Sequence, residues 1–69
     1  MKASDDPKGM TDDELETAGR HHATLADTYR RMAMKAESSE LRAANTRLAG
    51  VHQASADGCA AEAKRRGIA

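Results

Sequence analysis

MTDDELETAGRHHATLADTYRRMAMKA, residues 10–36, is the stretch that decides the fold. It opens with TDDE at residues 11–14, which fits a helix capping box. In such a box the Thr11 hydroxyl accepts a hydrogen bond from the backbone N–H of Glu14, and the Glu14 carboxylate accepts one from the backbone N–H of Thr11. Acidic side chains in the first turn also suit the positive end of the helix dipole. The local chemistry therefore predicts that a helix begins here.

A stripe of apolar or partly apolar side chains follows, at alternating spacings of three and four residues, the a/d pattern of packed helices. Its members are Leu15, Ala18, His22, Leu25, Tyr29, Met32 and Ala36. The stripe predicts an amphipathic helix over residues 11–37. One helix cannot bury its own apolar face, so a second helix has to cover it.

A second helix is expected over residues 40–66, which contain no proline and end in Lys64-Arg65-Arg66. Cations favour the negative end of a helix, and Gly67 suits the left-handed position that ends one. Residues 67–69 then form a short tail. A turn is expected at residues 38–39, with Ser39 capping the second helix.

Two arrangements of these helices compete. Met34, Leu41, Leu48 and Ser55 are spaced by seven residues, which favours one continuous helix. The first stripe, however, falls on mostly polar or small residues when it is extended beyond residue 36. The second segment carries its own stripe on a different face, Leu41, Ala44, Leu48, Val51 and Ser55. The change of face favours a helical hairpin, and a continuous helix stays open as the alternative.

Composition indicates that one copy buries little apolar area. The chain has 69 residues, and only six of them are Leu, Val or Ile, with no Phe. A core of this size rarely supplies more than about 3–5 kcal/mol, so small chains need staples or association. Cys59 is the only cysteine, so no internal disulfide is available. We expect an all-α homodimer resembling a four-helix bundle, with a core of Leu15, Ala18, His22, Leu25, Leu41, Leu48 and Val51.

The beginning of the chain differs in character from the rest. Residues 1–10 mix charge with Ser, Pro and Gly, so a disordered lead is expected. Residues 1–19 carry a net charge of −4 and residues 20–69 a net charge of +4. No apolar run suits a membrane span or a secretory signal, and the lone cysteine fits a reducing compartment. A cytoplasmic protein is expected.

Metal binding and catalysis are weakly indicated. His22 and His52 come roughly opposite each other in a hairpin, with Cys59 seven residues beyond His52, so a metal site between them is the alternative to a structural role in the core. Two thin helices offer no cleft that excludes water around a nucleophile and its base. We expect neither an enzyme nor a bound cofactor.

The end of the first helix is the expected partner site. Tyr and Arg are enriched at the energetic centres of interfaces, and Met provides an adaptable apolar surface. The predicted partner-binding residues are Tyr29, Arg30, Arg31, Met32 and Met34. The alternative is an RNA- or DNA-binding hairpin dimer that uses the arginines near the turn. Against it, the chain has one aromatic residue and hence no stacking platform.

The acidic start, the high alanine content and the short helical layout give the chain a family resemblance. It resembles small early proteins of temperate phages that act as anti-activators of quorum sensing. That resemblance implies a short helical dimer that binds a LuxR-type transcriptional activator and prevents DNA binding. A type IV pilus assembly ATPase is a second partner that the resemblance implies. It rests on length, composition and layout, and it transfers no individual site residue.

Overall fold

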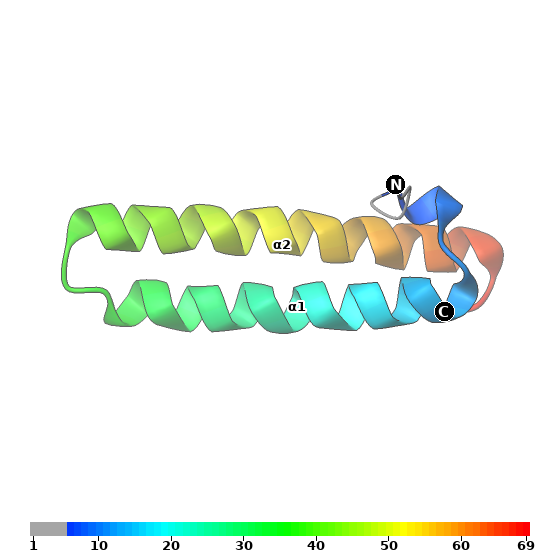
Figure 1. Cartoon of the computed structure of the whole chain (residues 1–69), viewed down its shortest axis with the longest axis horizontal. Helices are drawn as coiled ribbons and strands as arrows, with labels where there is room; N and C mark the ends of the chain where they lie inside the picture. Colours follow the sequence, from blue (N-terminus) through cyan, green and yellow to red (C-terminus); the bar gives the residue numbers. More distant parts are fainter. Residues whose placement is uncertain (1–5) are drawn as a thin grey trace.

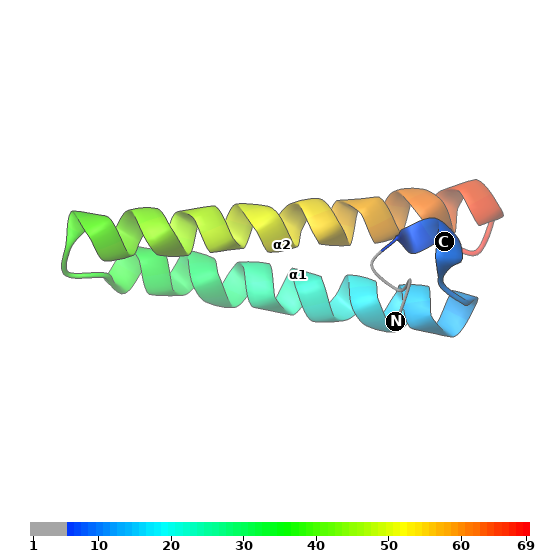
Figure 2. The same ribbon diagram turned by 45° about the horizontal axis from the view of Figure 1, so that its top comes forward.

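The structure is a computed structural model that describes residues 6–69, and its architecture is a helical hairpin (Figure 1). Helix α1 spans Asp12–Lys35, and helix α2 spans Ser39–Arg66. The two helices lie side by side and antiparallel in both views, and a short 3-10 helix, η1 (Pro7–Gly9), packs near the open end (Figure 2). The expected all-α hairpin is therefore confirmed, and the continuous helix is excluded.

The start of α1 has the expected capping box. The Thr11 hydroxyl accepts from the Glu14 backbone N–H at 3.1 Å, and Glu14 Oε1 accepts from the Thr11 backbone N–H at 2.9 Å. Both bonds satisfy N–H groups that have no partner inside the helix. The first helical residue is Asp12 and Thr11 is its cap, as the capping box predicts.

The turn lies slightly earlier than the sequence predicted. Helix α1 ends at Lys35 rather than at residue 37, and the connection runs over residues 36–38. Ser38, not Ser39, caps α2, because its side-chain oxygen accepts from the backbone N–H of Leu41 at 3.1 Å. Ser39 is the first helical residue. The prediction of Ser39 was wrong because two adjacent serines offer the same capping chemistry.

The expected disordered lead over residues 1–10 is wrong for its second half, and residues 1–5 lie outside the described part of the chain. Asp6 caps η1, since its carboxylate accepts from the backbone N–H of Lys8 at 3.1 Å. Pro7 stands at the start of η1, where its missing N–H costs nothing. The segment then packs on α2, where a Cβ atom at Gly58 would lie 3.7 Å from Cγ of Pro7, an ordinary van der Waals contact.

The seam between the helices is built from small side chains. Its buried members are Leu15, Ala26, Ala33, Ala49, Ala56 and Cys59. On α1 the seam keeps the positions of Leu15 and His22 but turns toward Ala26 and Ala33, one residue beyond Leu25 and Met32. The predicted stripe therefore has the correct period. Its positions at Leu25 and Met32 were wrong, because the seam uses the next residues, Ala26 and Ala33. Small residues occupy these positions because they allow the two helix backbones to approach closely.

The end of α2 closes as expected. Gly67 adopts φ 79°, and the backbone N–H of Ile68 donates to the carbonyl of Ala63 at 3.0 Å. A side chain at Gly67 would be strained in this left-handed conformation. Neither helix of the described chain combines the length and the apolar character that a membrane span requires.

Candidate interaction surfaces

Five large apolar side chains lie outside the seam and on one face of the hairpin, which we call the apolar face. They are Leu25 and Met32 of α1 and Leu41, Leu48 and Val51 of α2. Leu41 is 57% exposed, Val51 55%, Met32 47% and Leu48 40%, whereas Leu25 is half-buried. The largest aliphatic side chains of the molecule are thus mostly unused by its own core.

Helix geometry places these side chains together. Residues seven apart share one side of a packed helix, so Leu25 lies with Met32, and Leu41 lies with Leu48. The opposite flank of each helix is marked by Arg30 and Gln53, whose side chains are hydrogen-bonded across the helices at 2.5 Å. The side of α1 that carries Arg30 and the side of α2 that carries Gln53 therefore lie on the same face of the hairpin. The opposite sides of the two helices, which carry the leucines, lie together on the other face.

The apolar face is also free of charge. Between residues 18 and 32 of α1, the residues on the apolar face are Ala18, His21, Leu25, Thr28 and Met32. On α2 its positions from Leu41 to Ser55 are Leu41, Ala44, Leu48, Val51 and Ser55. None of these is Asp, Glu, Lys or Arg, although such residues make up 32% of the chain. A charge-free helical face with exposed leucines is typical of a surface that packs against other helices.

The predicted dimer core divides between the two surfaces. Leu41, Leu48 and Val51 lie on the apolar face, with Ala18 and Leu25 half-buried beside them. Leu15 is instead only 1% exposed in a single copy, and half-buried His22 contacts His52 across the seam. The seam of a single hairpin therefore already uses Leu15 and His22.

The opposite face carries a groove of about 700 Å³ near the turn, which we call the basic groove. Buried Ala33 and Ala49 form its floor, one from each helix. Gly50 and Ala54 line it on α2, and Arg30 and Arg42 also line it. Met34, the most exposed of the large apolar side chains at 83%, stands at the same groove. The groove thus combines an apolar floor with positive side chains.

The two arginines of the basic groove hydrogen-bond to neutral oxygens rather than to carboxylates. Arg30 donates to the neutral amide oxygen of Gln53, and Arg42 donates to the backbone carbonyl of Ala36 at 3.3 Å. In the described residues, four other arginines form ion pairs with carboxylates, namely Arg20, Arg31, Arg65 and Arg66. Asp57 also lines the groove, but its recorded partner is the amide of Gln53 at 2.9 Å.

The five predicted partner-binding residues do not form one patch. Arg30 and Met34 line the basic groove, and Met32 lies on the apolar face. Tyr29 is half-buried in the seam, where its ring stacks on His52 with centroids 5.7 Å apart. Arg31 is paired with Asp27, one helical turn earlier. The five were grouped by residue type, and a helix turns neighbouring residues onto different faces.

A histidine pair occupies the middle of the seam. The Nδ1 atoms of His22 and His52 lie 2.8 Å apart, and the rings stack with centroids at 5.0 Å. The expected meeting of these two side chains is therefore present. Cys59 is a buried free thiol. Within residues 6–69, no group of three or more His, Cys, Asp or Glu side chains is arranged to hold a metal ion.

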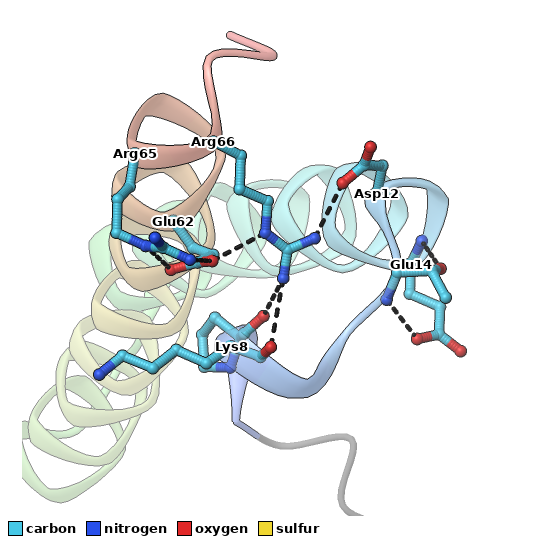
Figure 3. A network of polar contacts seen from close by, with 8 residues as sticks. Lys8, Asp12, Glu14, Glu62, Arg65 and Arg66 are labelled. Atoms are coloured by element: carbon cyan, nitrogen blue, oxygen red, sulfur yellow. Dashed lines mark hydrogen bonds and ion pairs between the residues drawn. The ribbon is translucent and has the colours of Figure 1, made fainter.

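An ion-pair network locks the open end of the hairpin (Figure 3). The Arg66 guanidinium contacts Glu62 at 2.7 Å, Asp12 at 2.8 Å and the backbone carbonyl of Pro7 at 3.1 Å. Glu62 is itself only 5% exposed and also accepts from Arg65 at 2.9 Å. Hydrogen bonds from Arg65 and then Arg66 lower the pKa of Glu62 from 4.5 to about 2. One arginine thus joins α1, α2 and η1.

No family model, curated protein or solved structure matches this chain.

Proposed function

We propose that this chain is a non-enzymatic protein-interaction module that works as a homodimer. The observation that carries the proposal is the apolar face, where Met32, Leu41, Leu48 and Val51 are each at least 40% exposed. Leaving such side chains in water forfeits roughly 25 cal/mol for each Å² of apolar surface. A second copy is the favoured occupant, because the face is uncharged and self-complementary packing makes a four-helix bundle.

The need for association supports the same proposal. The seam of one hairpin consists largely of alanine, and a core of this kind buries little apolar surface. Chains of this length commonly gain stability from oligomerisation. Pairing two hairpins through their apolar faces would place the leucines in the centre of a bundle and leave both basic grooves on the outside.

The inhibitory role is the further part of the proposal, and it rests on the resemblance to phage anti-activators. A phage-encoded dimer of this kind would act in the host cytoplasm by occupying a surface of a regulatory protein, such as a LuxR-type transcriptional activator. A type IV pilus assembly ATPase is a second candidate. Mixing the chain with a purified LuxR-type activator and its operator should reduce the shifted DNA band in a mobility assay. Unchanged DNA binding at saturating chain would contradict this target.

Sedimentation equilibrium tests the dimer. The wild-type chain should sediment as a dimer, and Leu41→Glu/Leu48→Glu should sediment as a monomer that keeps its helical circular dichroism. The control Thr24→Glu/Ala43→Glu adds the same two charges at exposed positions outside the apolar face, and it should stay dimeric. A monomeric wild type, or a leucine variant that remains dimeric, would contradict the proposal.

A further inference from the structure

We infer that the basic groove docks an amphipathic helix of a partner protein, and that this helix carries carboxylates beside its apolar side chains. The inference rests on the proposed function, because it assigns the apolar face to a second copy and leaves the groove for a different protein. It names the chemistry of that protein's contact segment.

The shape of the groove favours a helix as the occupant. Its floor lies between two antiparallel helices and consists of Ala33 and Ala49, whose small side chains let a third helix approach. Its lining on α2 runs from Arg42 to Asp57, a length of ~22 Å at 1.5 Å per residue, which matches about four helical turns. The described chain has no strand, so it offers no edge to which an extended peptide could add.

Room for a side chain of the partner is present at Gly50. A Cβ atom built on Gly50 meets nothing within 4 Å, although the residue lies in the interior of α2. Glycine there weakens the helix relative to alanine by roughly 1 kcal/mol. The open space beside Gly50 leads to exposed Met34 across the groove, so an apolar side chain of the partner would find apolar neighbours.

The charges of the groove favour acidic side chains on that helix. The groove is lined by two arginines and one carboxylate, Asp57. Arg30 and Arg42 both donate to neutral oxygens, and Asp57 accepts from the amide of Gln53. Replacing a neutral acceptor by a carboxylate makes a stronger hydrogen bond. Phosphates would satisfy the arginines equally well, but they would leave the apolar floor and Met34 uncovered. A protein helix therefore fits the groove better than a nucleic acid.

Fluorescence anisotropy with a synthetic peptide tests the inference. The probe is a helix-forming peptide of about 20 residues with leucines at i, i+3, i+4 and i+7 and glutamates on both sides of that stripe. A matched peptide has lysines in place of the glutamates. The acidic peptide should bind the wild-type dimer, and the lysine peptide should bind at least about tenfold more weakly, since each lost charged hydrogen bond weakens binding by that order.

Two variants locate the binding site. Gly50→Leu fills the groove, and Arg30→Glu/Arg42→Glu reverses its charge; each should weaken the acidic peptide about tenfold or more. The control Arg20→Glu/Lys64→Glu makes the same change of net charge outside the groove and should bind normally. Gly50→Leu should keep its helical fold, because a Cβ atom at this position meets nothing within 4 Å. Undiminished binding by both groove variants would overturn the inference.

Three other outcomes would also overturn it. A labelled RNA hairpin that binds more tightly than the acidic peptide and is lost in Arg30→Glu/Arg42→Glu would assign the groove to nucleic acid. A change of sedimenting mass in Gly50→Leu would assign it to a second copy. A wild-type dimer that does not bind the acidic peptide would contradict this inference alone. A monomeric wild type would instead contradict the proposed function.

Discussion

Gly19 and Cys59 form the closest approach recorded between the two helices at a glycine. A Cβ atom on Gly19 would lie 3.3 Å from the Cβ of Cys59, which is tighter than an ordinary van der Waals contact. Gly19 interrupts an otherwise strong helix sequence, and this contact gives the physical reason. A side chain at this point would require Cys59 to shift, whereas a Cβ atom at Gly50, in the interior of α2, meets nothing within 4 Å.

The two glycines therefore predict opposite effects of the same substitution. Gly19→Leu should lower the free energy of unfolding by about 1–3 kcal/mol, because it overpacks the seam beside Cys59. Gly50→Leu should raise it by roughly 0.5–1 kcal/mol, because leucine is the better helix former. Urea denaturation followed by circular dichroism, at one protein concentration for all variants, measures both changes. Equal effects at the two sites would contradict the described seam.

Glu62 predicts an acid-sensitive step in stability. Its pKa is about 2 in the folded chain against an ordinary value of 4.5, so its contribution is fully present above pH 4.5 and is lost as the pH falls toward 2. Glu62→Gln removes this titration, so the melting temperature should depend less on pH inside that window than it does for the wild type. Thermal melts between pH 2 and 6 measure this dependence, and identical slopes for the two proteins would refute the assignment.

The contacts of Arg66 predict that η1 stays packed on the helices only while this side chain is present. Its guanidinium donates to the backbone carbonyls of Pro7 and Lys8, and it is the residue that connects η1 to both helices. Arg66→Met should release η1 and accelerate hydrogen exchange at the amides of Gly9 and Met10. Lys64→Met is the control and should leave both amides protected. Slow exchange in Arg66→Met would show that packing alone holds η1.

The histidine pair predicts an unusual tautomer. A hydrogen bond between two Nδ1 atoms requires that one of them carries hydrogen and the other does not. When both imidazoles are neutral, one ring of His22 and His52 should therefore be protonated at Nδ1. Two-dimensional proton–nitrogen spectra identify the tautomer, with exposed His21 as the internal reference. Protonation of both rings at Nε2 would rule this hydrogen bond out.

Local chemistry made the ends of the helices predictable. The capping box at Thr11 and Glu14 and the left-handed Gly67 each depend on backbone groups a few residues away, so the sequence alone determines them. The turn was predicted from the change of apolar face, although the cap fell on Ser38 instead of Ser39. The helical packing of η1 was not predictable, because it depends on Arg66, which is distant in sequence.

The seam could not be read from hydropathy. Large side chains at Leu25 and Met32 suggest burial, whereas the neighbouring Ala26 and Ala33 are the residues that the structure buries. Close backbone contact selects small residues, and it turns the larger ones outward. The basic groove was equally hidden, because Arg30 and Arg42 meet there only once the turn sets the register of the two helices.

The most direct test of the central claim is an isotope-filtered nuclear Overhauser experiment on a mixture of labelled and unlabelled chains. The claim is that alanines close one hairpin and that the large aliphatic residues join two hairpins. Contacts between copies should then arise from the methyl groups of Met32, Leu41, Leu48 and Val51, and the methyl groups of Ala33 and Ala49 should show contacts only within a copy. Contacts between copies at Ala33 and Ala49, or none at Leu48, would contradict the account.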